Sequence, residues 1–448
     1  MSNMKKIDFT KNDFIKNVFT MTSGTVIGYG INTVSLLIIS RIYTKTVLGA
    51  YDLMVSSASI FITIMMLSLT LVVMLPEEDY EANAICKIML ISNVLGIFII
   101  GSVLLLGYPK IQIFEIDINY KVGIVFFLVY MLTYNVQAIY YSYLNRKKCY
   151  RQLFWNPIIT ATVNSAVSIA LSRFGTMGYL FGTISSYIIS TCAMAFFVSP
   201  FAGKHDIAFL WKILKKYRNY PIVQLPANFV ELLALQLPIQ FFGHVYSTEI
   251  LGGYSMACKL LSMPVSLLAT PINRVYYRTL IDKIKTNDGI GSYIYKMIKN
   301  NLLLISLPIS IMMIWGTEII GFILGREWSV CGEYIAIIGF MYILKFCTTC
   351  TGGTFVATNN TKVSLQYAIL TLAQYGLCFG ICYILKLNYK FVMSIYTINV
   401  VVNTFICIAL TMKCIGEKTK SIFIFLIRYL IINALVVYGI RWLKGEMF

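Results

Sequence analysis

Apolar segments of roughly twenty residues recur along the chain from Asn17 onward, and short polar loops separate them. At 1.5 Å of rise per residue, each segment can cross a hydrocarbon layer of about 30 Å as a helix. Only a helix satisfies its own backbone hydrogen bonds in that layer. The pattern therefore predicts spans near 17–40, 47–75, 84–106, 122–144, 153–171, 177–198, 221–243, 250–275, 294–316, 331–357, 362–385, 390–412 and, more weakly, 421–443.

The last segment is the weakest because it contains Arg428. A charge at bilayer depth is costly, so this segment is either a complete crossing or a shorter apolar stretch from Tyr429. The composition of 58% hydrophobic and 12% charged residues, with a mean hydropathy of +0.75, excludes a soluble fold. We expect an all-α integral membrane protein with twelve transmembrane helices, or thirteen if the last segment crosses.

Cations gather in loops that fall on one side of the predicted membrane. The positive-inside rule makes that side cytoplasmic and places the N-terminus there, so we expect a multi-pass protein of the cytoplasmic (inner) membrane. The net charge of +18 then reflects topology and attraction to anionic lipids rather than binding to nucleic acid. The apolar run from Val18 is too long for a signal peptide, and we expect it to remain as the first helix. The cations are Lys5, Lys6, Lys11, Lys16, Arg146, Lys147, Lys148, Arg151, Lys212, Lys215, Lys216, Arg218, Arg278, Lys283, Lys285, Lys413, Lys418 and Lys420.

A short internal repeat suggests that the chain arose by duplication. The segment Leu48–Tyr51 (LGAY) returns 203 residues later as Leu251–Tyr254 (LGGY), and each copy follows a tyrosine by the same spacing. A duplication predicts two six-helix lobes, related as parallel repeats, around a central cavity. The alternative is a common turn signal repeated by chance. On the first interpretation, residues 1–200 form the N-terminal lobe, 201–220 a cytoplasmic linker, 221–412 the C-terminal lobe, and 413–448 a basic connector with the extra helix.

Prolines are concentrated in the two spans that follow the linker. A proline inside a helix removes a backbone hydrogen bond and kinks the rod. Such kinks suit lobes that rock between two states, but they also occur in rigid bundles. Five of the ten prolines lie there, namely Pro221, Pro226, Pro238, Pro264 and Pro271.

Two stretches of the chain have distinctive residues. The first contains Tyr220-Pro221, Leu225–Ala227, Gln236–Pro238 and Leu251–Pro264, and the second contains Gly325–Trp328 with Gly332–Tyr334. Both stretches resemble the bacterial polysaccharide flippases. These are the Wzx-type O-antigen and capsule repeat-unit transporters, in the superfamily that also holds multidrug and toxin extruders and the peptidoglycan lipid flippase.

The resemblance implies transport of an undecaprenyl-pyrophosphate-linked oligosaccharide from the cytoplasmic to the periplasmic leaflet by alternating access. Such transport serves the synthesis of lipopolysaccharide O-antigen, capsule or exopolysaccharide. The implied partners are this substrate, membrane lipids, a polysaccharide polymerase and a chain-length regulator. No cofactor is expected.

A pyrophosphate needs cationic or hydrogen-bonding partners to cross hydrocarbon. Lys259 and Lys345 lie well inside their spans, and we expect both to line the cavity and bind the pyrophosphate or anionic sugars. The alternative is a structural ion pair with Glu231. Arg41 and Arg274 lie at span ends, where snorkelling or topology explains them, unless they assist release and capture of the cargo.

Two carboxylates, Glu231 and Asp52, are expected within the spans. Such groups are costly unless they are paired or protonated, and they can carry a coupling H⁺ or Na⁺. Asp52 alternatively caps or tethers the start of its helix. The glycine pairs Gly24/Gly28 and Gly376/Gly380 are expected to allow close helix contact.

Other classes of function find little support. No P-loop is present, the aqueous segments are too short for a catalytic domain, and we expect no enzyme activity. Cys347 and Cys350 form one C-x-x-C, but with only two histidines in the chain no metal site is expected. The alternatives are an ion-coupled multidrug extruder, which the buried lysines disfavour, and a membrane polymerase or ligase of lipid-linked glycans, which the short loop 107–121 disfavours.

Overall fold

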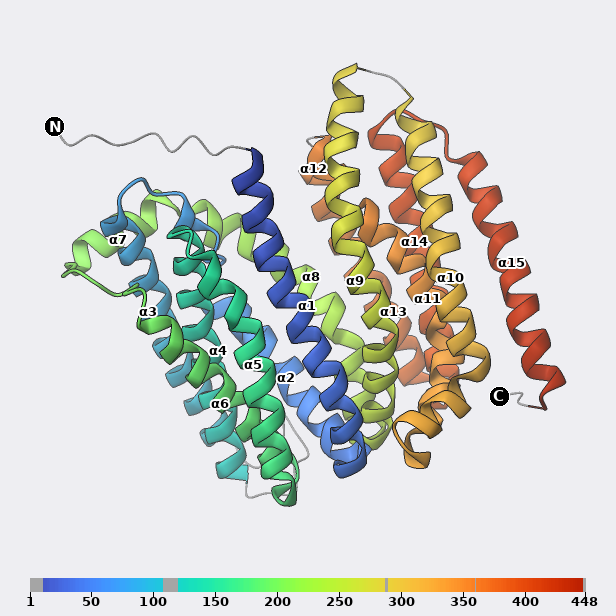
Figure 1. Cartoon of the computed structure of the whole chain (residues 1–448), viewed down its shortest axis with the longest axis horizontal. Helices are drawn as coiled ribbons and strands as arrows, with labels where there is room; N and C mark the ends of the chain where they lie inside the picture. Colours follow the sequence, from blue (N-terminus) through green and yellow to red (C-terminus); the bar gives the residue numbers. More distant parts are fainter. Residues whose placement is uncertain (1–10, 108–119, 287–288, 359, 446–448) are drawn as a thin grey trace. The chain divides into compact units, whose positions relative to one another are not determined.

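The computed structural model describes the chain except residues 1–10, 108–119, 287–288, 359 and 446–448. The described residues form helices and no strand, which confirms the predicted all-α fold (Figure 1). The helices are α1 Lys11–Ile42, α2 Lys45–Met65, α3 Asp79–Leu106, α4 Tyr120–Arg146, α5 Tyr150–Ala170, α6 Thr176–Ala195, α7 Ile207–Lys216, α8 Leu225–Phe241, α9 Thr248–Thr286, α10 Ile290–Ile323, α11 Val330–Thr351, α12 Thr354–Ala357, α13 Thr361–Ile384, α14 Tyr389–Cys414 and α15 Lys420–Leu443.

Each predicted span coincides with a helix, and eleven helical segments among the described residues are long and apolar enough to cross a membrane. Helices α5 and α6 are not among the eleven, so the number of crossings stays a prediction. Their polar side chains bond to each other instead: Asn156 donates to Ser190 at 2.7 Å, and Thr183 donates to Asn164 at 3.2 Å. The polarity that weakens their apolar signal therefore serves helix packing.

The helices differ from the predicted spans in several places. Helix α9 continues to Thr286 rather than ending near residue 275, and α11 ends at Thr351 rather than near residue 357. Helix α2 ends at Met65 rather than near residue 75, because Leu67 and Ser68 adopt left-handed backbone angles that a helix does not accommodate. Helix α15 is continuous through Arg428, so the shorter stretch from Tyr429 is wrong. Helix α7 was not predicted, because ten residues are too few to register as a span.

Contacts divide the chain into two compact units. The first contains the described residues up to Tyr43 together with Met54–Phe229, and the second contains Thr44–Leu53 together with Val230 onward. Residues at the start of α2 thus group with the second unit, whereas the rest of α2 belongs to the first. The interpretation of two lobes as repeats stays a prediction.

In the first unit, glycines allow α1 and α5 to approach closely. A Cβ atom on Gly24 would lie 2.3 Å from the carbonyl oxygen of Phe154, and one on Gly28 would lie 2.8 Å from that of Pro157. The prediction of close contact is confirmed for this pair. It is wrong for Gly376 and Gly380, whose added Cβ atoms would meet nothing within 4 Å, because both glycines lie on the exposed face of α13.

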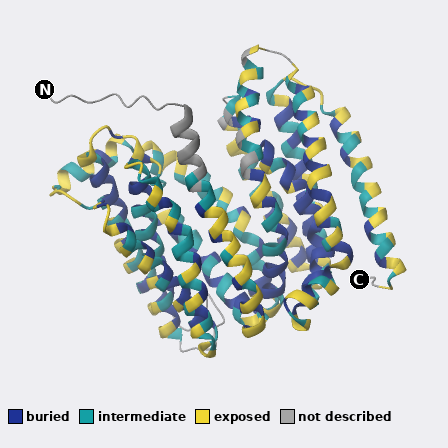
Figure 2. Ribbon diagram, viewed as in Figure 1, coloured by how far each residue is buried: buried dark blue, intermediate teal, exposed yellow. Residues whose placement is uncertain are grey.

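The second unit is built around α11. This helix contacts α9, α10 and α14, and 83% of its most apolar stretch is buried, compared with 17% for α15 (Figure 2). A central helix surrounded by others is apolar on nearly all sides, so any polar residue on it needs a specific environment. Lys345 is such a residue.

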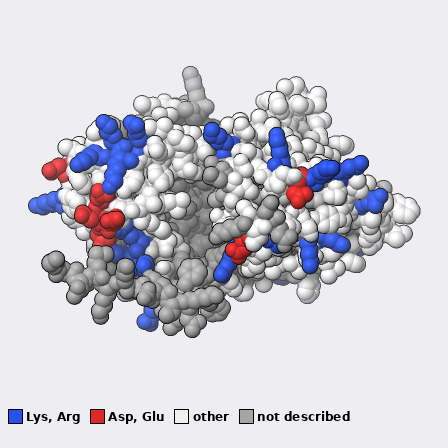
Figure 3. All heavy atoms as spheres, turned by 90° about the horizontal axis from the view of Figure 1, so that it is seen from above, with Lys and Arg blue, Asp and Glu red and all other residues white. Residues whose placement is uncertain are grey.

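Cations are abundant on the face seen from above in Figure 3. The short helix α7 contributes Lys212, Lys215 and Lys216, and the amine of Lys216 donates to Glu81 of α3 at 2.7 Å. Exposed Ile207 and Trp211 lie four residues apart on the same helix. The helix is therefore amphipathic, with apolar and basic residues both exposed.

Candidate functional site

The two copies of the repeated segment, Leu48–Tyr51 and Leu251–Tyr254, contact each other in the structure. A Cβ atom on Gly49 of α2 would lie 1.8 Å from the carbonyl oxygen of Thr248, and one on Gly252 of α9 would lie 1.9 Å from that of Lys45. Each carbonyl belongs to the residue four positions before the other copy's glycine. The contact is thus reciprocal, and it brings the first turns of α2 and α9 together backbone to backbone within the second unit.

Two ion pairs flank this glycine contact. Lys45 lies 2.9 Å from Glu249, and the amine of Lys259 donates to both carboxylate oxygens of Asp52 at 2.8 Å. The Asp52 side chain is 12% exposed and that of Lys259 is 41% exposed, so the second ion pair is partly buried. Lys259 thus forms an ion pair, as the structural alternative held, but with Asp52 rather than with Glu231, and it is not among the residues that line the pocket described next.

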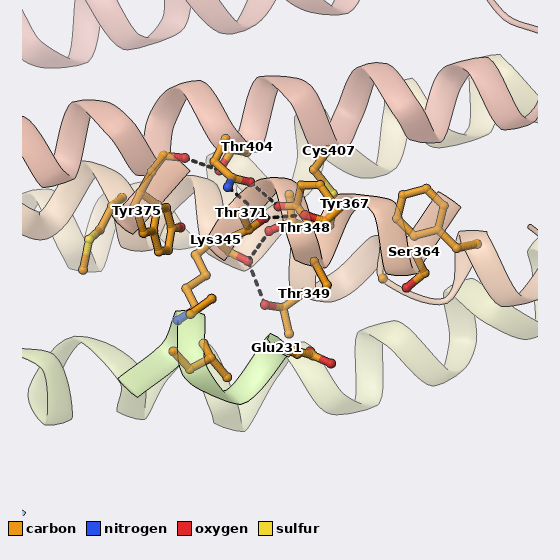
Figure 4. A pocket seen from close by; sticks show the side chains of 18 of the residues that line it. Glu231, Lys345, Thr348, Thr349, Ser364, Tyr367, Thr371, Tyr375, Thr404 and Cys407 are labelled. Carbon is orange, nitrogen blue, oxygen red and sulfur yellow. Dashed lines mark hydrogen bonds between the residues drawn. The ribbon is translucent and has the colours of Figure 1, made fainter. Parts of the chain in front are cut away.

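A pocket of about 320 Å³ lies within the second unit, between α8, α11, α13 and α14 (Figure 4). Lys345 of α11 and Glu231 of α8 are the charged side chains among the described residues that line it. Two of the residues predicted from the sequence are therefore brought to one pocket. In Figure 4 the amine of Lys345 and the carboxylate of Glu231 lie apart and do not point toward each other.

Lys345 is exposed to this pocket although its neighbours Leu344 and Phe346 are fully buried. Its amine lies 5.8 Å from the centre of the Tyr342 ring, a favourable position for a cation beside an aromatic face. Among the described residues, no carboxylate lies within ion-pair distance of this amine. The ammonium group is therefore available to a ligand.

Hydroxyl and amide groups on the opposite wall bond to one another. Tyr367 donates to the side-chain oxygen of Asn403, and the Asn403 amide donates to Thr371 at 3.0 Å. Thr371 in turn donates to the carbonyl of Tyr367 at 2.8 Å. The sequence held a signal that was missed, because Tyr367, Thr371 and Tyr375 recur every four residues and so share one face of α13.

The two predicted arginines are not in this pocket. Arg41 is exposed in the last turn of α1, where snorkelling or topology remains the simpler interpretation. The side chain of Arg274 lies outside the described residues, so its predicted role stays a prediction. A second pocket, of about 400 Å³, lies between α5 and α6 in the first unit, and none of the predicted site residues lines it.

A metal site is not evident in the part of the chain that the structure describes. No group of three His, Cys, Asp or Glu side chains is placed to hold a metal ion there. Cys347 and Cys350 are both buried as free thiols, which is the usual state of cysteine in a helical core.

Comparison with known proteins decides the family. The family model described as "Polysaccharide biosynthesis protein" matches residues 54–333, which is more than half of the chain. The chain belongs to this family. A curated relative is the teichuronic acid biosynthesis protein TuaB of Bacillus subtilis (strain 168), which is 20% identical over 240 residues, or 53% of this chain and 50% of TuaB. The chain thus matches about half the length of that relative.

Solved structures share the fold of this polysaccharide biosynthesis protein. The lipid II flippase MurJ in an inward closed conformation aligns with a TM-score of 0.67 at 12% identity, covering 95% of this chain and 97% of that one. An inward-facing multidrug resistance MATE transporter aligns with a TM-score of 0.64 at 12% identity, covering 89% and 98%. A transporter from Pyrococcus furiosus, whose binding pocket has reversed polarity, aligns with a TM-score of 0.54 at 13% identity, covering 90% and 96%. The chain is therefore a multi-pass membrane protein that shares the fold of these solved transporters.

Proposed function

We propose that the chain is a flippase that moves undecaprenyl-pyrophosphate-linked oligosaccharide units from the cytoplasmic to the periplasmic leaflet. The observation that carries this proposal is a polysaccharide biosynthesis family member folded like MurJ, which flips lipid II. The transported unit would serve the synthesis of O-antigen, capsule or exopolysaccharide. The chain would need no catalytic group, because translocation changes no covalent bond.

The geometry of the second unit supports alternating access. The α2–α9 contact includes two closely packed glycines and two ion pairs, and ion pairs can open and form again between states. Helix α8 carries Pro238 and is bounded by two π-helical turns, η3 (Tyr220–Gln224) and η4 (Phe242–Tyr246). Prolines and π-helical turns are established places for a helix to bend. We assign the hinge to these turns.

Orientation and cargo contacts are part of the same proposal. The cation-rich face lies on the cytoplasmic side of the inner membrane, together with the N-terminus. Lys345 contacts the cargo, whereas Lys259 becomes available to it only when the pair with Asp52 opens. Glu231, which is exposed to the pocket, is the candidate for coupling to H⁺ or Na⁺.

The proposal is tested by deleting the gene and locating the lipid-linked glycan. We expect the glycan to accumulate in the cytoplasmic leaflet with loss of surface polymer, and to recover when the chain is expressed again. Normal delivery to the periplasmic leaflet in the deletion strain would overturn the proposal. A multidrug extruder would instead alter drug susceptibility and leave the glycan in place, whereas a polymerase or ligase would leave flipped but unjoined units.

A further inference from the structure

The pocket between α8, α11, α13 and α14 contains few groups that are free to bind a ligand. Thr348 and Thr349 donate to the carbonyl oxygen of Lys345 at 3.0 and 2.8 Å, and Thr404 donates to that of Val400 at 3.0 Å. Together with the bonded set of Tyr367, Thr371 and Asn403, these contacts occupy most of the polar lining. The ammonium of Lys345 and the carboxylate of Glu231 remain available, one as a donor and the other as an acceptor.

The net formal charge of the described lining is zero, because it holds one lysine and one glutamate. A pyrophosphate carries more than one negative charge. It would exceed the charge of the one lysine and would be repelled by the glutamate, at a cost that a pocket within a helical bundle increases. The charge balance therefore disfavours the diphosphate as the group bound at Lys345.

An uncharged sugar ring matches the same lining. Its hydroxyl groups both donate and accept hydrogen bonds, so they can accept from Lys345 and donate to Glu231. Three tyrosines, Tyr367, Tyr375 and Tyr396, supply aromatic surface for the C–H faces of a ring. The volume of about 320 Å³ is at the small end of ligand pockets, which suits one part of the cargo rather than all of it.

We infer that this pocket binds an uncharged sugar of the lipid-linked cargo, between Lys345 and Glu231, and that the diphosphate is held elsewhere. The inference rests on the proposed function and narrows the role of Lys345 from the pyrophosphate to the glycan. It also makes Glu231 a ligand of the sugar hydroxyls.

Binding to the purified full chain in lipid nanodiscs tests the inference. The probes are glucose, galactose and N-acetylglucosamine as neutral sugars, glucuronate as an anionic sugar, and inorganic pyrophosphate, each titrated by calorimetry. We expect at least one neutral sugar to bind, and Lys345→Met to weaken it by about tenfold or more, because a hydrogen bond to a charged group is lost. Lys345→Arg should retain part of the affinity. Lys390→Met is the matched control, since Lys390 bonds to Glu333 and does not line the pocket.

The sign of the effect of Glu231→Gln separates the ligands. For a neutral sugar the variant should bind more weakly, because a charged acceptor is replaced by a neutral one. For pyrophosphate or glucuronate it should bind more tightly, because a repulsion is removed. Two results would overturn the inference. In one, Glu231→Gln tightens the binding of an anionic probe, and Lys345→Met abolishes that binding. In the other, none of the neutral probes binds. Either result leaves the flippase proposal standing if the deletion strain still traps the glycan in the cytoplasmic leaflet, so the two failures are distinguishable.

Discussion

Adding one methyl group at the α2–α9 contact should destabilise the protein measurably. In Gly252→Ala the new Cβ would lie 1.9 Å from the carbonyl oxygen of Lys45, whereas ordinary contacts begin at 3.4 Å. The two helices would have to separate by about 1.5 Å, and both neighbouring ion pairs depend on that approach. Forced overpacking of this kind typically costs about 1–3 kcal/mol.

The matched control is Gly376→Ala on the exposed face of α13, where the new atom meets nothing within 4 Å. Alanine is favoured over glycine in a helix by roughly 0.5–1 kcal/mol, so this variant should be unchanged or slightly more stable. Thermal unfolding in detergent, followed by fluorescence, measures both. A Tm for Gly252→Ala equal to or above that of Gly376→Ala would refute the close contact.

Three further predictions concern side chains in the second unit. Asp52→Asn and Lys259→Gln should each lower the free energy of unfolding, and a double-mutant cycle should show a coupling of about 1–3 kcal/mol, whereas additive effects would mean that no ion pair forms. Tyr367→Phe should cost about 1–3 kcal/mol in urea or thermal unfolding, because it removes the donor to the buried Asn403 oxygen; an unchanged Tm would argue against the bond. Lys345→Ala should reduce surface glycan several-fold at equal protein level, and unchanged display on immunoblots would reject its role in transport.

The positions of the helices were predictable because a membrane helix requires a long apolar stretch of sequence. Even Arg428, about two turns inside α15, did not interrupt its helix, since the long side chain of an exposed arginine can extend its charged head toward the interface. The end of α2 was missed because residues 66–75 remain apolar after the helix stops, and hydropathy does not register the left-handed backbone at Leu67 and Ser68. The amphipathic helix α7 was missed for the opposite reason, since it is too short.

The candidate site was only partly predictable. Sequence position identified Lys345 and Glu231 as charged residues deep in their spans, and the structure brings both to one pocket. The ion pair between Asp52 and Lys259 was not predictable, since the two residues are 207 positions apart in the sequence. They pair because Gly49 and Gly252 allow their helices to approach closely. Likewise, Gly376 and Gly380 have the same spacing as Gly24 and Gly28, and only the neighbouring helix distinguishes a contact from an exposed face.

The most direct test of the account is reconstitution of the purified chain in liposomes with a lipid-linked oligosaccharide that carries a label on its glycan. Access of a membrane-impermeant glycan-cleaving enzyme to the label reports which leaflet holds the lipid. The account predicts that lipid initially protected in the inner leaflet becomes accessible over time in liposomes that contain the chain, and more slowly with Lys345→Ala. Equal protection in liposomes with and without the chain would contradict it.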